Sequence, residues 1–193
     1  MHHHARILSR MGTGMGIAIA LLSVPSYAQA CRLGKIVPPS PEMNTFQSEE
    51  LGLSLEIPTN YRSILRNSGH ITFHDPSTFE FIQCLTRTDQ YGAVPPYVTL
   101  EVYQVGSPNS DLVQIVRRKR PWVDYYSPDY RPIEVQGYPA IQYEYTNEIY
   151  ELPIANVSFL SEDGQTLFTL SGPAQHPILE NALSTLEIVR SVP

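Results

Sequence analysis

The stretch LPIANVSFLSEDGQTLFTLS, residues 152–171, predicts a β-hairpin late in the chain. Its two apolar halves, 152–160 and 165–171, flank Ser161-Glu162-Asp163-Gly164. Asp-Gly is a favoured turn pair between two neighbouring antiparallel strands, because both residues tolerate the backbone angles of a tight turn. The hairpin therefore indicates an antiparallel sheet, to which the other expected strands can be added.

Further strands are expected upstream of this hairpin. In 51–57 apolar and polar residues alternate, as they do along a half-buried strand, and Pro58 ends the pattern. Residues 46–48 are expected to pair with that strand across a turn at 49–52. The remaining expected strands are 61–66 and 70–74, which flank Asn67-Ser68-Gly69 in a second hairpin, then 97–105, 133–135 and 139–147.

Three amphipathic segments predict helices. Ser77-Thr78-Phe79-Glu80 has capping-box spacing and predicts a short helix through Leu85, although this run fits a strand nearly as well. Asn109 or Ser110 can cap a second helix that ends before Pro121. A third helix begins near Pro177, and its apolar stripe consists of Ile178, Leu179, Ala182, Leu183, Leu186 and Val189.

These elements predict an α+β fold. Many strands in hairpins with two or three helices are typical of an antiparallel β-sheet on which the helices pack, in the manner of an α/β/α sandwich. No internal repeat and no second linker interrupts residues 45–193, which we expect to form a single α+β domain. Hydrophobic residues make up 42% of the chain, which excludes wholesale disorder.

Residues 1–30 have the pattern of a signal peptide. Arg6 and Arg10 supply a positive start, 12–24 is an apolar run, and Ala28-Gln29-Ala30 is a small-x-small cleavage site. The apolar run of about thirteen residues is too short to span a bilayer, which takes about twenty residues as a helix. We therefore expect an exported protein.

The segment that follows contains Pro38, Pro39 and Pro41 without apolar periodicity, so 31–44 is predicted as a proline-rich tether. Cys31 would be the first residue after cleavage, where bacterial lipoproteins carry their lipid. A disulfide with Cys84 is the second interpretation, because an exported compartment is oxidising. Two unpaired thiols are the third, and the sequence leaves all three open.

The charge balance disfavours nucleic-acid binding. The chain has 13 basic and 19 acidic residues, and without Arg6 and Arg10 of the leader 11 basic residues remain, which changes the formal charge from −6 to −8. Nucleic-acid binding depends on cations that neutralise phosphates. We therefore expect no nucleic-acid partner.

Enzyme signatures are missing. The sequence contains no nucleophile elbow, no H-E-x-x-H zinc motif and no paired C-x-x-C. His70 and His74 are the nearest approach to a metal pair, but four residues along a strand advance about 13 Å, which is too far for one ion. We expect a non-enzymatic protein without catalytic residues, metal or cofactor.

Arg117-Arg118-Lys119-Arg120 is the only run of basic residues in an acidic chain. One interpretation is a docking patch for an acidic partner or anionic lipid. The other is the end of a helix, where cations interact favourably with the macrodipole by about 0.3–1 kcal/mol each. The two interpretations are compatible.

Aromatic residues gather directly after this run. The only tryptophan, Trp122, is followed by Tyr125, Tyr126 and Tyr130 in a turn-like segment that is hard to bury. In 139–147 the residues Ile141, Tyr143 and Tyr145 share one strand face. Tyrosine and tryptophan are enriched at binding hot spots, but they also pack well within sheets. The candidate binding residues are Arg117, Arg118, Lys119, Arg120, Trp122, Tyr125, Tyr126 and Tyr130.

The order of elements resembles the PsbP-like family of lumenal and periplasmic proteins. The resemblance lies in an early hairpin that ends in Leu55-Glu56-Ile57-Pro58, the late hairpin around Asp163-Gly164, and the closing run Ser184-Thr185-Leu186-Glu187-Ile188-Val189-Arg190-Ser191. The resemblance implies an antiparallel sheet sandwiched by helices and a location in the periplasm or thylakoid lumen. It also implies an accessory or assembly role at photosynthetic membrane complexes, without a catalytic motif.

The leading hypothesis is therefore an exported, non-enzymatic protein that docks on a membrane-associated protein complex, as an assembly or stability factor of the photosystem kind. Its own attachment to a membrane would depend on a lipid anchor at Cys31. The alternative is a periplasmic enzyme or carbohydrate-binding module that uses the tyrosine-rich region. A deep pocket would favour an enzyme, and an exposed aromatic surface would favour a partner.

Overall fold

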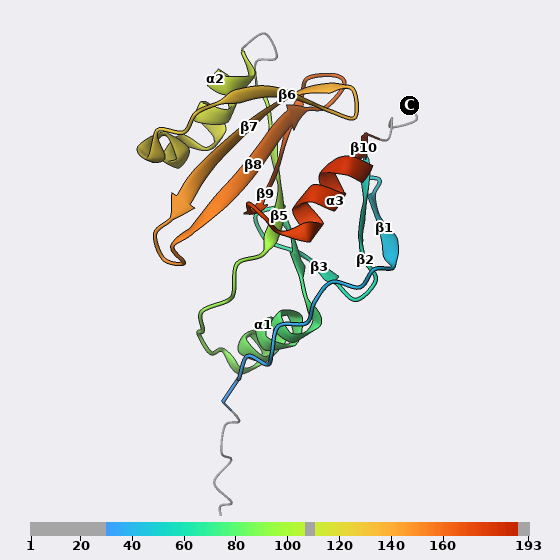
Figure 1. Ribbon diagram of the computed structural model, residues 1–193, viewed down its shortest axis with the longest axis vertical. Helices are drawn as coiled ribbons and strands as arrows, with labels where there is room; N and C mark the ends of the chain where they lie inside the picture. The colour runs from blue at the N-terminus through green and yellow to red at the C-terminus, as the bar shows by residue number, and fades with distance from the viewer. Residues whose placement is uncertain (1–29, 107–110, 189–193) are drawn as a thin grey trace, which may run out of the picture. The chain divides into compact units, whose positions relative to one another are not determined.

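The protein is described by a computed structural model over residues 30–106 and 111–188. Apart from Ala30, the predicted signal peptide (1–30) lies outside the described residues, as do the expected helix caps Asn109 and Ser110. Within the described residues the strands form two antiparallel sheets, one of seven strands and one of three (Figure 1).

The predicted hairpin 152–171 lies in the interior of the larger sheet. Its strands pair from Ile154 opposite Pro173 to Leu160 opposite Leu167. Gly164 closes the turn with a φ of 70°, which glycine adopts without steric cost. In sheet order the strands are β3 (Arg62–Leu65), β4 (Ile71–His74), β5 (Val98–Gln104), β9 (Thr166–Pro173), β8 (Leu152–Leu160), β7 (Tyr138–Asn147) and β6 (Arg131–Val135).

The smaller sheet pairs the early hairpin with the last described residues. β1 (Met43–Ser48) pairs with β2 (Leu53–Pro58) as predicted, and β2 also pairs with β10 (Glu187–Ile188). The last helix, α3 (Pro177–Thr185), therefore ends before Leu186 instead of following its apolar stripe onward. Pairing with the free edge of β2 gives the backbone of Glu187 and Ile188 hydrogen-bond partners in the smaller sheet. Val189, the last residue of the predicted stripe, lies outside the described residues.

The remaining helices lie where the sequence predicts them. Residues 79–85, which also fitted a strand, belong to α1 (Pro76–Thr88). Its cap is Asp75 rather than Ser77, because Asp75 Oδ1 accepts the backbone N–H groups of Ser77 and Thr78 at 3.0 and 3.4 Å. The segment before Pro121 forms α2 (Leu112–Lys119), and the 3₁₀ helix η1 (Pro121–Tyr126) follows it directly.

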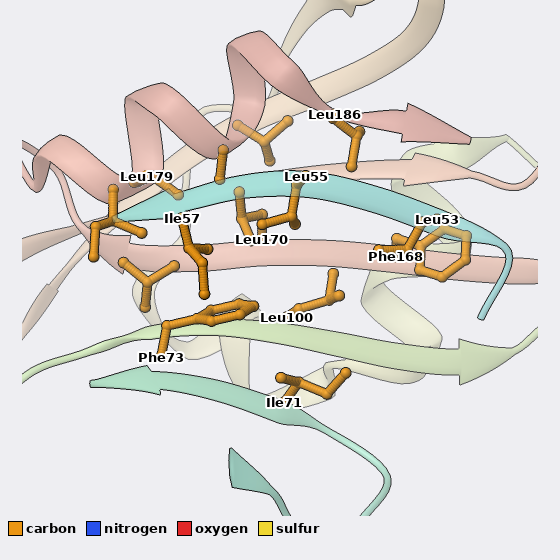
Figure 2. Packing of buried hydrophobic residues seen from close by; sticks show 14 of the residues in the cluster. Leu53, Leu55, Ile57, Ile71, Phe73, Leu100, Phe168, Leu170, Leu179 and Leu186 are labelled. Atoms are coloured by element: carbon orange, nitrogen blue, oxygen red, sulfur yellow. The ribbon is translucent and has the colours of Figure 1, made fainter. Parts of the chain in front are cut away.

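The main core lies between the smaller sheet, α3 and one face of the larger sheet (Figure 2). Leu53, Leu55 and Ile57 of β2 point at Leu100, Phe168 and Leu170 of the larger sheet. Leu179 of α3 and Leu186, which directly follows that helix, close the core. Each fully buried side chain of this size contributes about 1.5–3 kcal/mol. The α+β fold with helices packed on an antiparallel sheet is thus confirmed.

The opposite face of the larger sheet is covered by α2 and η1. Ile115 and Val116 of α2 and Val123 of η1 pack there against Ile141 and Leu167. This second apolar cluster is small, and polar side chains fill the sheet face next to it. Arg120, the last residue of the basic run, contacts these polar side chains.

The two cysteines form a disulfide between the N-terminal segment and α1, with their Cα atoms 5.7 Å apart. Residues 31–44 are therefore not the free tether that their prolines predict. Two backbone N–H groups of this segment donate to side chains of the domain. That of Val37 donates to Asp75, and that of Ser40 donates to Asn60. A cysteine in a disulfide has no thiol for a lipid, so the bonded form offers no anchor at Cys31.

Loss of the disulfide is expected to destabilise the protein. The bridge closes a loop with a sequence separation of 53, and removing such a bridge costs about 2–4 kcal/mol, because the unfolded chain gains conformational freedom. Guanidinium denaturation of the Cys31→Ser/Cys84→Ser variant, compared with the oxidised protein, measures the difference. An unchanged midpoint would show that the segment is held without the bond.

Candidate functional site

The basic run does not form one surface. Arg117 and Arg118 are exposed at the end of α2 and Lys119 is partly exposed, but Arg120 is only 1% exposed. The prediction that Arg120 belongs to a surface patch is therefore wrong. The helix ends at Lys119, and the backbone of Arg120 turns its side chain beneath the helix instead of outward.

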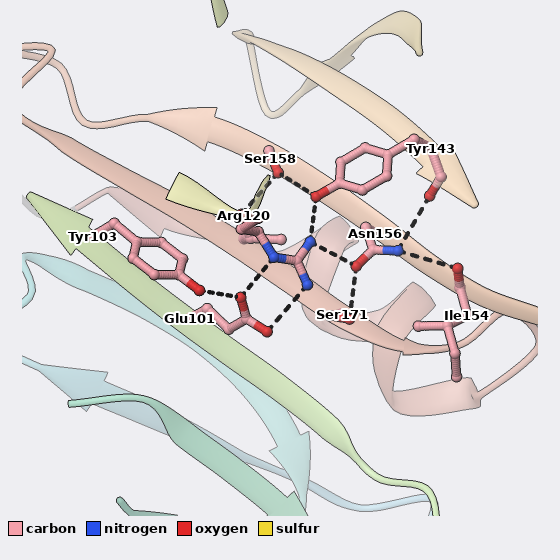
Figure 3. Close-up of polar contacts among 9 residues, drawn as sticks. Glu101, Tyr103, Arg120, Tyr143, Ile154, Asn156, Ser158 and Ser171 are labelled. Atoms are coloured by element: carbon pink, nitrogen blue, oxygen red, sulfur yellow. Dashed lines mark hydrogen bonds and ion pairs between the residues drawn. The ribbon is translucent and has the colours of Figure 1, made fainter. Parts of the chain in front are cut away.

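The Arg120 guanidinium binds Glu101 of β5 through two atoms (Figure 3). Its Nε lies 2.8 Å from one carboxylate oxygen, and its Nη2 donates to the other at 3.2 Å. Nη1 donates to Asn156 Oδ1 of β8 at 2.9 Å and to the hydroxyl of Tyr143 of β7. One side chain from the end of α2 thus holds three strands of the larger sheet.

A second ring of hydrogen bonds fixes these partners. Tyr103 donates to Glu101 at 2.7 Å, and Ser171 donates to Asn156 Oδ1 at 2.8 Å. Burial raises the pKa of Tyr103 and of Tyr143, so both hydroxyls stay protonated near neutral pH. The guanidinium is enclosed by Glu101, Asn156 and Tyr143, so this network positions α2 and η1.

Three of the predicted aromatic residues form an exposed surface on η1. Trp122 is 44% exposed and Tyr125 is 79% exposed. Tyr126 stacks on Tyr145 of β7 with ring centroids 4.8 Å apart, and Trp122 meets Tyr145 edge to face at 5.3 Å. We call Trp122, Tyr125, Tyr126 and Tyr145 the aromatic patch. Arg120 supports it from below, with its guanidinium 4.6 Å from the Trp122 ring.

Tyr130 lies outside the aromatic patch. Its ring packs on Tyr143 at 5.0 Å, and the Arg117 guanidinium lies over its outer face at 5.3 Å. Arg117 also pairs with Asp124 at 3.2 Å. Arg117 is therefore held in place beside η1, while no contact of the Arg118 or Lys119 side chain is seen in the described residues.

Tyr145 is the patch residue that the sequence did not single out. Its face on the strand was predicted, since it shares that face with Ile141 and Tyr143. The missing information was that η1 lies beside β7, so that Tyr126 can stack on it. Burial raises the pKa of Tyr145 to about 12, and its hydroxyl is therefore neutral at physiological pH.

His70 directly precedes β4, and His74 is the last residue of that strand. In the described part of the chain, no group of three or more His, Cys, Asp or Glu side chains could hold an ion. His74 is buried, and its Nε2 lies 3.2 Å from Arg66 Nη2 and 2.7 Å from the Thr72 hydroxyl. Burial first, and the charge of Arg66 second, lower its pKa from 6.5 to about 4. His74 is therefore a neutral imidazole.

Replacing Arg120 tests whether the network holds the fold together. Arg120→Ala leaves the Glu101 carboxylate without its cation and opens a cavity, so we expect a loss of about 3–5 kcal/mol in urea unfolding. Arg118→Ala is the matched control and should change stability by less than about 0.5 kcal/mol. Similar losses for the two variants would contradict a special role for Arg120.

The buried His74 predicts a pH-dependent stability. Because its folded pKa of about 4 lies below the unfolded value of 6.5, the unfolded chain binds a proton first as the pH falls. Stability should be complete above pH 6.5 and decrease by as much as about 3 kcal/mol by pH 4. Urea midpoints measured across this range should fall less in His74→Gln than in the parent protein.

A smaller slope should remain in that variant, because burial also lowers the pKa of His176. His70→Gln, which removes a histidine outside the buried contacts of His74, is the matched control. Equal slopes for His74→Gln and the parent protein would show that His74 is not the group responsible.

Comparison with known proteins addresses the fold. No family model matches the sequence, and no curated protein matches it either. A solved structure of cyanobacterial PsbP (CyanoP) from Synechocystis sp. PCC 6803 is similar, with a TM-score of 0.50 and 11% identity over 80% of this chain and 96% of that chain.

A Bacteroides thetaiotaomicron protein gives a TM-score of 0.43 and 10% identity over 76% of this chain. The match spans 48% of the Bacteroides chain, about half of its length. In the described residues, no helix is both long and apolar enough to cross a membrane. The match with cyanobacterial PsbP, at 11% identity, shows a similar fold, in agreement with the resemblance in the order of elements.

Proposed function

We propose that the protein is an exported, non-enzymatic accessory protein that docks on a membrane-associated protein complex through its aromatic patch. The observation that carries this proposal is the exposure of Trp122 and Tyr125 on a short helix whose third aromatic residue, Tyr126, stacks on Tyr145. Large aromatic side chains that a partner can cover supply much of the binding energy in protein interfaces.

The patch is rigid before it meets a partner. Trp122 packs on Tyr145 and on the buried Arg120, while Tyr126 packs on Tyr125 and Tyr145. Ordering side chains on binding costs about 0.5–1.5 kcal/mol each, so rings that are already held lose less. A preformed aromatic surface therefore favours specific docking over a transient hydrophobic contact.

The neighbouring cations suit an acidic partner surface. Arg118 is exposed at the end of α2, and Lys119 is partly exposed beside it. Charges at the rim of an interface mainly accelerate association and select the partner. The rest of this chain is acidic, so the basic end of α2 also orients the protein toward an acidic surface.

The location of that partner is inferred from the leader and the fold. The predicted signal peptide directs the protein out of the cytoplasm. Its fold likeness to cyanobacterial PsbP supports the PsbP-like resemblance, which implies a lumenal or periplasmic accessory role at photosynthetic complexes. We therefore place the partner among the exposed subunits of such a complex, where the protein would act in assembly or stability.

A carbohydrate-binding function is the second candidate, because exposed Trp122 and Tyr125 would also suit stacking against sugar rings. A competition experiment with soluble oligosaccharides distinguishes the two functions. Soluble oligosaccharides would displace a sugar from the patch, whereas they would leave a protein partner bound.

Crosslinking pull-down from detergent-solubilised membranes of the source organism tests the docking proposal. The parent protein should capture subunits of a membrane complex, and Trp122→Ala/Tyr125→Ala should reduce that capture at least about tenfold. Tyr91→Ala is the matched control, because Tyr91 is 98% exposed but lies outside the patch. Capture that is unchanged in the double variant, or absent in the parent protein, would overturn the proposal.

A further inference from the structure

The strand β3 is a free edge of the larger sheet. It pairs with β4 on one side, and no strand of the described residues lies on its other side. The backbone N–H of Arg66 donates to the C=O of His70 at 2.8 Å, so these two residues form a hydrogen-bonded pair at the end of the β3–β4 ladder. Hydrogen-bonded and non-hydrogen-bonded pairs alternate along an antiparallel ladder. Ile64 therefore bonds to β4, whereas Ser63 and Leu65 turn their backbone N–H and C=O groups to the free edge.

A groove of about 1000 Å³ lies along this edge, between β3 and α1. Residues 63–66 form its wall on the strand side, and Phe79, Ile82 and Arg87 belong to its wall on the helix side. Leu65 is 68% exposed, so the edge is open to a partner. An extended peptide can add to an open sheet edge as a further strand, with main-chain hydrogen bonds for affinity and pockets for alternate side chains for specificity.

The groove carries positive charge without a negative counterpart. Arg66 lines it from the end of β3, and Arg87 lines it from α1. Within the described residues neither guanidinium has a carboxylate partner, and no aspartate or glutamate belongs to the lining. Arg66 is also held in place, since its Nε donates to the Thr72 hydroxyl at 3.1 Å and its Nη2 lies 3.2 Å from His74 Nε2. Charge complementarity therefore favours an acidic occupant.

A second copy of this chain suits the edge poorly. The antiparallel register that uses the free backbone groups of both edges pairs Ser63 of one copy with Leu65 of the other. That register brings Arg62 of one copy opposite Arg66 of the other, and like charges directly opposite each other destabilise a strand pair. A different protein with an acidic strand would instead bring carboxylates to these arginines.

The faces of β3 predict the side-chain pattern of an added strand. Ile64 shares a strand face with Arg62 and Arg66, because every second residue points to the same side. The opposite face of this hairpin packs in the main core, so the face of Ile64 turns toward α1, where Ile82 lines the same groove. A strand with an apolar residue opposite Ile64, flanked by acidic residues opposite the two arginines, fits this face.

We infer that the edge of β3 and the groove beside α1 bind an extended acidic segment of another protein as a further strand of the larger sheet. The backbone of that segment bonds to Ser63 and Leu65, and its acidic side chains pair with the arginines of the groove. No groove residue belongs to the aromatic patch, so this interface goes beyond the proposed function and does not depend on it.

Four pentapeptides with blocked ends test the inference on the parent protein. ETVTE places acidic residues opposite the arginines, valine opposite Ile64, and threonines, which favour strands, opposite Ser63 and Leu65. QTVTQ removes the charges, KTVTK reverses them, and ETVTE with both threonine amides N-methylated cannot donate hydrogen bonds to the edge. Each peptide is titrated into the ¹⁵N-labelled protein at low ionic strength and followed by NMR. We expect ETVTE to bind at least about fivefold more tightly than each of the other three.

Strand addition also predicts which backbone amides become protected. The N–H groups of Ser63 and Leu65 should exchange with deuterium at least about tenfold more slowly at saturating ETVTE, because the peptide covers them. The N–H of Ile64 already bonds to β4, so it is the internal control and should change less. Protection of Ser63 and Leu65 that rises with protein concentration in the absence of peptide would assign the edge to a second copy and overturn the inference.

Arg87→Gln removes one cation of the groove at an exposed helix position, so the affinity for ETVTE should fall about two- to fivefold. Arg118→Gln, at an exposed position of α2, is the matched control and should leave the affinity unchanged. The comparison of the four peptides on the parent protein does not depend on any variant folding. Binding of any of the other three peptides as tightly as ETVTE, no saturable binding of ETVTE, or no protection of Ser63 and Leu65 would also overturn the inference.

Discussion

The ion pair between Arg120 and Glu101 is the contact on which the arrangement of the larger sheet depends. A single guanidinium spans β5, β7 and β8, with every part of it opposite an acceptor or an aromatic ring. A buried pair of this kind is costly to break, because either partner alone would leave an uncompensated charge. The pair therefore specifies one position for the end of α2.

That position determines where the aromatic patch lies. Pro121 follows Arg120 directly and begins η1, so Trp122 and Tyr125 are placed a few residues from a rigid anchor. One face of the sheet beneath packs on the main core, and the other face carries the network beside the second apolar cluster. Exposed aromatic residues on such a support are held in one arrangement, whereas the same residues on a free loop would collapse together.

The N-terminal segment is attached to the domain far from the aromatic patch, near α1. There the disulfide and the hydrogen bonds of Val37 and Ser40 hold the N-terminal segment against the domain. The sequence could not show this, because prolines and the absence of periodicity are equally typical of a free linker and of an extended segment packed on a domain. The acceptors that hold it, Asp75 and Asn60, are far away in the sequence.

Local patterns carried much of the fold prediction. Alternation in 51–57 and 139–147, the Asp163-Gly164 turn and the periodicity after Pro177 each predicted the correct element, because strand and helix periods depend on nearby residues. The helix of 79–85 was ambiguous, and only packing on the sheet resolved it. Likewise, the stripe through Leu186 predicted a longer helix than the one that β2 allows.

The sequence by itself determined the hairpins and the helices before Pro121 and after Pro177, and it indicated that Tyr125 lies in a segment that is hard to bury. Only the tertiary structure decided that Arg120 is buried, that Tyr145 completes the patch, and that Cys31 meets Cys84. The physical reason is the same in each case. Hydrogen-bond and packing partners such as Glu101 and Asn156 come from distant strands, and no local spacing records which strands become neighbours.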